Sequence, residues 1–298
     1  MWKEKFIQYL RYEKNYSSLT EVSYLKDLSQ FETFVTQEQE REEWDILLID
    51  RDLIRIWISE LMESGLSART VNRKLSSLKS FFKYLKRMGV IEQNPTEKVS
   101  APKIAKKLPT FANDKELGKV LDDALAYSDD FRGCRDQFII ELLYLTGIRR
   151  AELIALKDSD IDFSTCTLRV TGKRNKQRII PFSDATKAKL QQYIETRDTE
   201  VANKSSSFLF VKENGEPLYP RLVYSIVNRQ LSDIQTLSRK SPHTLRHSFA
   251  TEMLNNGAEI NVVKEILGHS SLASTEVYTH VTFDELKRVY QNAHPRAQ

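Results

Sequence analysis

With 298 residues, of which 40% are hydrophobic and 29% charged, the chain is too long for one core and too apolar for a disordered protein, so we expect two globular domains. No apolar run approaches the ~20 residues of a membrane-spanning helix, and the first residues do not resemble a signal peptide. Cys134 and Cys166 form no CxxC motif, which favours a reducing, cytoplasmic compartment. The net charge is only +4, so the distribution of charge along the chain is more informative than its total.

Apolar residues recur at three- and four-residue spacing in four stretches near the N-terminus, which predicts a helical domain. The stretches are residues 1–13, 17–36, 50–63 and 67–88. Ser17 or Ser18 and Ser67 are suited to N-caps, and Gly89 is suited to end the last helix. We therefore expect an all-helical N-terminal domain over residues 1–93.

The stretch that follows, NPTEKVSAPKIAKKLP at residues 94–109, contains three prolines, and we interpret it as an extended basic linker. Residues 69–107 hold eleven Lys or Arg and only Glu92 and Glu97, a local net charge of +9. Such a patch can neutralise phosphates and release their counterions, which favours nucleic acid. The alternative is a solvated helix face. The candidate DNA-binding residues are Arg73, Lys74 and Lys79.

The C-terminal domain, predicted over residues 110–298, begins with helical stretches near 113–127 and 131–146. The runs 167–171 and 178–182 are rich in β-branched residues and flank the turn-prone GKRNK, so they predict a β-hairpin that presents Lys173 near its turn. Helical periodicity resumes after Ser183. The segment SPHTLRHSFATEMLNNG predicts a further helix, with Ser241 as its cap, Pro242 at its first position and Gly257 at its end.

All five histidines lie at residue 243 or beyond, which points to a function for imidazole in this part of the chain. His243 and Arg246 share one helix face because they are three residues apart. A zinc site with His243 and His247 is an alternative, but HTLRH lacks the Glu of HExxH and places a cation beside the ligands. Arginine forks and imidazoles suit phosphoryl transfer without a metal, with a tyrosine as nucleophile.

At these residues the chain resembles the tyrosine recombinase family. The matching motifs are TGIRRAEL (146–153), GKRNKQR (172–178), HTLRH (243–247), LGHS (267–270) and Tyr278. The resemblance implies Tyr278 as nucleophile, Arg149 and Arg246 as phosphate clamps, Lys173 as general acid, His243 as proton acceptor or hydrogen-bond partner, His269 as phosphate ligand, and Glu152 as a residue that orients the site. It also implies a mainly α fold: an N-terminal SAM-like helical bundle that binds the core DNA site, and a mostly α catalytic domain with a small antiparallel hairpin.

The resemblance further implies the reaction and the partners. DNA would be cut through a 3′-phosphotyrosyl intermediate and rejoined, with no metal, cofactor or ATP. The chain is most like the Xer recombinases, which resolve chromosome dimers as two pairs of subunits on a short site. The partners would then be double-stranded DNA and a second Xer-type recombinase. A septal DNA translocase is a possible activator. The chain starts directly with the helical domain, which speaks against an arm-binding integrase.

Two residues depart from the family pattern, and other functions stay open. Arg150 stands where a small aliphatic residue is usual, and Arg174 replaces a common glycine, which puts the geometry of the hairpin turn in doubt. The alternatives are an integrase or transposase of a mobile element, a type IB topoisomerase, and a DNA-binding protein with a decayed site.

The last apolar stripe, Phe283, Leu286, Val289 and Tyr290, predicts a short terminal helix at 283–291. The stripe needs a surface that covers it, and the family resemblance implies that a neighbouring subunit does so. The alternative is that the helix folds back onto its own domain.

Overall fold

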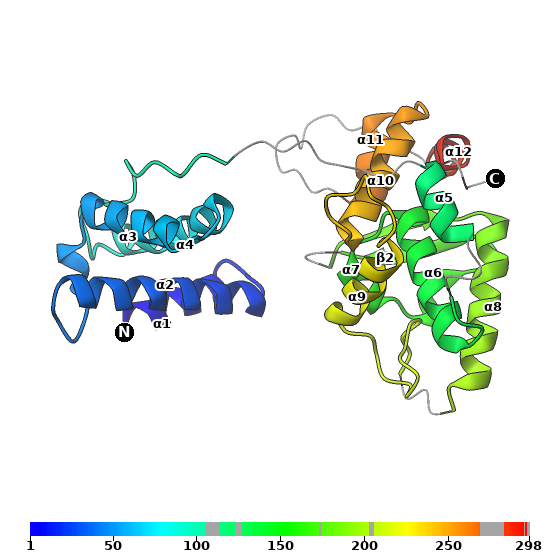
Figure 1. Ribbon diagram of the computed structural model, residues 1–298, viewed down its shortest axis with the longest axis horizontal. Helices are drawn as coiled ribbons and strands as arrows, with labels where there is room; N and C mark the ends of the chain where they lie inside the picture. Colours follow the sequence, from blue (N-terminus) through cyan, green and yellow to red (C-terminus); the bar gives the residue numbers. More distant parts are fainter. Residues whose placement is uncertain are drawn as a thin grey trace. The chain divides into compact units, whose positions relative to one another are not determined.

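The computed structural model divides the chain into two compact units, Met1–Lys107 and Leu108–Gln298, which we describe separately (Figure 1). The structure describes residues 1–104, 114–122, 127–172, 175–202, 206–268, 283–294 and 296. The boundaries expected from the sequence, 1–93, 94–109 and 110–298, stay a prediction.

The N-terminal unit contains the four helices that the apolar spacing predicts. They are α1 (Trp2–Tyr12), α2 (Ser18–Glu38), α3 (Arg51–Glu63) and α4 (Ala68–Arg87), with the 3₁₀ helix η1 (Ile46–Leu48) before α3. Both predicted serine caps are present, because Ser17 and Ser67 each accept a hydrogen bond from the backbone N–H three residues later. Gly89 has a φ of 70°, the left-handed conformation in which glycine ends a helix without strain.

The core of this unit is aromatic. Figure 1 shows α3 and α4 on one side of α2, which also packs against α1. Between them, Phe31 packs its ring against Trp57, and Phe6 packs against Phe81. Val99, from the segment expected to be linker, is buried in the same core. The first part of that segment is therefore packed structure and not a bare extension.

The second unit is mostly helical around a small sheet. Its helices are α5 (Asp114–Asp122), α6 (Phe131–Thr146), α7 (Arg150–Ala155), α8 (Asp184–Glu200), α9 (Pro220–Gln230), α10 (Pro242–Asn255), α11 (Ile260–Leu267) and α12 (Phe283–Ala293), with the 3₁₀ helix η3 (Asp158–Asp160). Its strands are β1 (Ile161–Asp162), β2 (Thr167–Thr171) and β3 (Gln177–Pro181). The predicted mainly α fold with a small antiparallel hairpin is confirmed.

The hairpin and helix α6 build the frame of this unit. Strands β2 and β3 are antiparallel, with Leu168 opposite Ile180 and Val170 opposite Arg178. Helix α6 is buried along most of its length and packs against α8 and α10 (Figure 1). It ends at Gly147, whose φ of 60° lets the chain turn sharply into α7. The sequence predicted Ser241 as the cap of α10. Ser241 is at the N-cap position, but its side chain makes no capping hydrogen bond, and its hydroxyl lies 3.2 Å from the Thr244 hydroxyl.

The terminal helix α12 lies on its own domain. Leu286, Tyr290 and Ala293 are buried in the core of the second unit, where α12 packs against α10, α11 and β3. The Tyr290 hydroxyl donates to the Leu145 carbonyl oxygen at 3.2 Å. Burial lowers the pKa of His294 to about 4, so this residue packs as a neutral ring beside Tyr290. The expectation of a neighbouring subunit over this face is therefore corrected for Leu286, Val289 and Tyr290, which pack against the core of the same chain.

No helix in the part of the chain that the structure describes is long and apolar enough to cross a membrane.

Candidate active site

The site is centred on the carboxylate of Glu152, which is only 5% exposed. Arg149 precedes α7 and donates to Glu152 twice: its backbone N–H to Oε2 and its Nη1 to Oε1, both at 2.8 Å. This arrangement is a capping box, in which the side chain three residues into a helix returns to its N-terminus. The local sequence RRAEL thereby fixes the direction of the Arg149 guanidinium, which donates from Nη2 to the Gly268 carbonyl oxygen at 3.1 Å.

A third residue of this cluster, Arg178 on β3, was not among the candidates from the sequence. Its Nη1 and Nη2 donate to Oε1 and Oε2 of Glu152 at 3.1 and 2.8 Å. Its Nε donates to the Ile266 carbonyl oxygen at 2.6 Å, near the end of α11. The sequence contains a signal for it, because Arg178 stands two residues before Ile180 in the predicted strand 178–182, and residues two apart on a strand share a face. An arginine on an inward face requires a buried acceptor.

Arg246 on α10 is anchored by backbone carbonyl groups. It is 7% exposed, and its Nη1 and Nη2 donate to the carbonyl oxygens of Gly147 and Leu267, both at 2.6 Å. These carbonyls lie at the C-terminal ends of α6 and α11, where unpaired C=O groups carry partial negative charge. One guanidinium therefore joins two helix ends that are far apart in the sequence.

Two glycines make the close approach of these segments possible. Gly147 and Gly268 both have positive φ, 60° and 64°. A Cβ on Gly147 would lie 2.5 Å from the Phe249 ring, and a Cβ on Gly268 would lie 3.1 Å from Nη1 of Arg178. A side chain at either position would be strained and would displace the groups that hold the arginines.

Within the described residues, the charges of the cluster do not balance. Three guanidinium groups, Arg149, Arg178 and Arg246, lie around one carboxylate, that of Glu152, in this part of the chain. Burial by itself would raise the pKa of Glu152, but the hydrogen bonds from Arg178 and Arg149 outweigh it and lower that pKa. Burial, followed by repulsion from Arg149, lowers the pKa of Arg246 to about 10, so Arg246 still carries its charge at neutral pH. The surplus of positive charge favours an anion such as a phosphodiester.

The remaining catalytic candidates are placed only in part. His243 is exposed in the first turn of α10, one turn before Arg246. Lys173, His269 and Tyr278 lie outside the described residues. Their described neighbours are close to the cluster: a Cβ on Gly172 would lie 3.3 Å from Glu152 Oε1, and Gly268 accepts from Arg149. The structure thus brings together Arg149, Glu152 and Arg246, as the motifs suggest, and adds Arg178.

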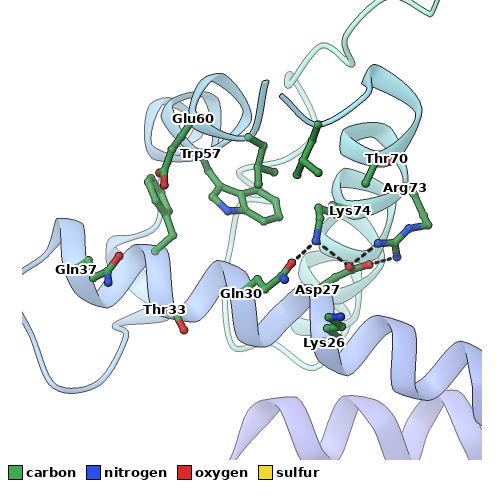
Figure 2. A pocket seen from close by; sticks show the side chains of 13 residues that line it. Lys26, Asp27, Gln30, Thr33, Gln37, Trp57, Glu60, Thr70, Arg73 and Lys74 are labelled. Carbon is green, nitrogen blue, oxygen red and sulfur yellow. Dashed lines mark hydrogen bonds and ion pairs between the residues drawn. The ribbon is translucent and has the colours of Figure 1, made fainter. Parts of the chain in front are cut away.

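The three candidate DNA-binding residues lie on α4 in the N-terminal unit, where each has a partner. Figure 2 shows the partners of Arg73 and Lys74. Arg73 donates from both Nη atoms to Asp27 on α2, and Lys74 donates to Gln30 and, at 3.3 Å, to Asp27. Lys74 is only 5% exposed, whereas the side chain of Arg73 is 48% exposed. Lys79 donates to the Val99 carbonyl oxygen at 3.2 Å. Arg73 and Lys74 line one end of a pocket of about 470 Å³, which has Trp57 and Leu61 in its apolar part.

Comparison with known proteins assigns both units. Residues 115–285 match the model of the phage integrase family, and residues 4–89 match that of the phage integrase N-terminal SAM-like domain. The chain is 41% identical to a protein of Anoxybacillus flavithermus named tyrosine recombinase XerC, over 98% of this chain and 97% of that protein. A protein of the same name from Bacillus subtilis is 38% identical over 98% of this chain and 95% of its own length.

Solved structures show the same fold. The XerH site-specific recombinase bound to its difH substrate is 25% identical, with a TM-score of 0.70 over 96% of this chain and 83% of that one. The Tn1549 transposon integrase is 22% identical, with a TM-score of 0.75 over 96% of this chain and 97% of that one. This chain therefore belongs to the phage integrase family, the family of the tyrosine recombinases.

Proposed function

We propose that this protein is a site-specific DNA recombinase that cuts one strand through Tyr278 and rejoins it to another. The observation that carries the proposal is the arginine cluster around Glu152, in which, among the described residues, three guanidinium groups lie around one carboxylate. A phosphodiester at this place would supply the missing negative charge. In the described part of the chain, Arg149 uses two of the five N–H groups of its guanidinium, so three are available to phosphate oxygens.

The reaction exchanges one phosphate ester for another. The Tyr278 oxygen forms a bond to phosphorus, the bond from phosphorus to the 5′-oxygen breaks, and the product is a 3′-phosphotyrosyl link with a free 5′-hydroxyl. The proton of the tyrosine hydroxyl passes to His243, and Lys173 donates a proton to the leaving 5′-oxygen. Attack by the 5′-hydroxyl of a second strand reverses these steps. The bond energy is kept in the ester, so no ATP is consumed.

The arginines and His269 act on the charge that develops at the phosphate. A tyrosine hydroxyl has an ordinary pKa of ~10 and is a poor nucleophile at neutral pH, so it needs a positive surrounding. Arg149 and Arg246 are held in place by the carbonyl oxygens of Gly268, Gly147 and Leu267 before DNA arrives. Donors that are already oriented need no rearrangement when negative charge grows on the phosphate oxygens, which lowers the barrier.

The test of this proposal is the covalent adduct. Incubation with a nicked DNA substrate, whose small 5′ fragment diffuses away after cleavage, should trap the protein on DNA. Tyr278→Phe should abolish the adduct while DNA binding in a gel-shift assay is retained, and the wild-type adduct should form in EDTA. Mapping the adduct by mass spectrometry to another tyrosine, Tyr290 for example, would refute the assignment.

For the biological role we favour resolution of chromosome dimers at cell division. The support is the likeness to proteins named tyrosine recombinase XerC over almost the whole chain. Sequencing DNA that is covalently bound to the protein in cells separates this role from its alternatives. A single site at the replication terminus supports it. Sites at the ends of a mobile element indicate an integrase or transposase, and binding without adducts indicates a decayed site.

We infer that the acting complex is a tetramer on duplex DNA, with a second Xer-type recombinase as partner and a septal DNA translocase as activator, all in the cytoplasm. The buried position of α12 limits how assembly can be tested. Removing residues 283–298 would uncover the core around Leu286 and Tyr290, so a truncated protein would lose stability as well as any contact with a neighbour. Crosslinking of the intact protein on DNA is therefore the suitable measurement.

A further inference from the structure

Arg178 occupies a position that the proposed chemistry does not use directly. It lies on β3 opposite Val170, and its side chain is 11% exposed. Its Nε, Nη1 and Nη2 donate to the Ile266 carbonyl oxygen and to the two oxygens of Glu152. These bonds orient the guanidinium toward the protein interior, so its chemistry differs from that of the more exposed Arg149.

Glu152 is where Arg178 and Arg149 meet. Each carboxylate oxygen accepts two hydrogen bonds, one from each arginine, at 2.8 to 3.1 Å. Half of the bonds that hold this buried carboxylate therefore come from Arg178. Without them, the carboxylate would be buried with Arg149 as its one remaining direct hydrogen-bonding partner among the described residues.

Two glycines, Gly172 and Gly268, lie close to this guanidinium. Gly268 lies so close that a Cβ there would be 3.1 to 3.3 Å from three atoms of the Arg178 side chain. A Cβ on Gly172 would lie 3.3 Å from Glu152 Oε1 and 3.8 Å from Arg178 Nη1. Arg178 thus links the end of the β-hairpin, the start of α7 and the end of α11 in one hydrogen-bonded cluster.

We propose that Arg178 is a positioning residue: it holds the Glu152 carboxylate ionised and oriented, and through it aims the Arg149 guanidinium at the DNA phosphate. The proposal rests on the recombinase function given above. It differs from a phosphate-contact role, because Arg178 acts through Glu152. It also differs from a purely structural role, because losing it should change how the reaction depends on pH.

The pH dependence follows from the charged groups that lie around Glu152, which among the described residues are Arg149, Arg178 and Arg246. In the intact protein, the hydrogen bonds outweigh the effect of burial and lower the pKa of Glu152. When Arg178 is removed, its hydrogen bonds and its charge no longer lower that pKa, so the pKa of Glu152 rises relative to the intact protein. A carboxyl group protonates as pH falls through its pKa, and a protonated Glu152 no longer accepts both bonds from Arg149. Activity of the variant should therefore be lost toward acid pH.

The experiment compares Arg178→Met with wild type in single-turnover formation of the covalent adduct, at saturating protein, from about pH 8 down to about pH 5. We expect Arg178→Met to be roughly 10- to 100-fold slower near pH 8 because Arg149 is misplaced. Relative to wild type, it should lose a further factor of about ten or more toward pH 5. Expressing rates relative to wild type cancels every pH dependence that the two proteins share.

Two further variants assign the effect. Adding Glu152→Gln to Arg178→Met should remove the acid loss, because the titrating group is gone. Arg169→Met on the same hairpin is the matched control: Arg169 is 49% exposed, bonds Asp160 and should leave rate and pH profile unchanged. If Arg178→Met does not fold, Arg178→Lys, which keeps the charge but not the fork, is measured in the same way.

The outcomes separate the two proposals. A wild-type protein that forms no adduct on Tyr278 refutes the recombinase mechanism, whatever Arg178 does. A wild-type adduct together with an Arg178→Met profile parallel to wild type refutes the positioning role. Acid loss that persists in the double variant with Glu152→Gln also refutes it, because another group would then be titrating.

Discussion

Both units of this protein bury carboxylates among basic side chains, and the clusters around Asp27 and Glu152 differ in what holds the cations. In the N-terminal unit, Asp27 is 2% exposed and binds Arg73, Lys74 and the Ser77 hydroxyl, all from α4. In the second unit, Glu152 binds arginines from two separate segments, and these also donate to backbone carbonyls. The first cluster joins two helices, whereas the second joins a loop, a strand and a helix end.

The comparison shows that a basic residue in a sequence is not yet a phosphate contact. Lys74 and Arg246 are both almost fully buried. Lys74 is held by the side chains of Asp27 and Gln30, so its charge is largely neutralised where it lies. Arg246 is held by carbonyl dipoles, which orient the guanidinium but carry no full negative charge. Among the described residues, a full negative charge lies against Lys74, whereas the carbonyl oxygens that accept from Arg246 supply only partial charges. Three predictions test this difference.

The largest effect is expected from Arg246→Ala. Removing a preorganised donor from the transition state should slow adduct formation by roughly 10²-fold or more, while the intact N-terminal unit preserves most of the DNA binding. Arg149→Ala should cost a similar factor. Quenched-flow cleavage assays with gel-shift titrations measure the two properties separately. If Arg246→Ala abolishes binding and leaves the rate of bound complexes unchanged, its charge serves docking and the contrast with Lys74 disappears.

A smaller effect, on stability, is expected from Asp27→Asn. Lys74 would stay buried without its ion partner, and breaking a buried pair from one side costs about 3–5 kcal/mol. All three tryptophans, Trp2, Trp44 and Trp57, belong to the N-terminal unit, so tryptophan fluorescence in urea reports the unfolding of that unit. Asp52→Asn is the matched control: its ion pairs are exposed and should contribute less than about 1 kcal/mol. Equal losses in the two variants would contradict a structural role for the Asp27 cluster.

The smallest effect is expected in the salt dependence of DNA binding. Replacing Arg73, Lys74 and Lys79 together should flatten the log–log slope by up to ~0.9 for each lost phosphate contact. The structure predicts different effects for two of these residues. Arg73→Gln should change the salt slope because the Arg73 side chain is 48% exposed. Lys74→Gln should leave the slope unchanged because Lys74 is buried. Fluorescence anisotropy across a salt series measures the slopes. A slope that is unchanged in the triple variant would show that this patch is merely solvated.

The sequence predicted the helices and the hairpin well because their signals are local. Ser17 and Ser67 accept hydrogen bonds from residues three positions along, and the apolar stripe of α4 repeats within single turns. The pairing of Arg149 with Glu152 is local in the same sense, because the two residues are three apart. Lys173, His269 and Tyr278 could be chosen only through the family resemblance, and their roles stay predictions.

The tertiary structure alone decided the contacts between segments that are distant in the chain. Arg246 reaches a carbonyl 99 residues away, Arg178 binds a carboxylate 26 residues away, and Lys74 meets Asp27 across 47 residues. The same holds for α12, whose stripe predicted a covered face but not which surface covers it. Periodicity and capping report on neighbours along the chain. Whether a cation is neutralised or left with surplus charge depends on neighbours in space, which only the packing of the helices supplies.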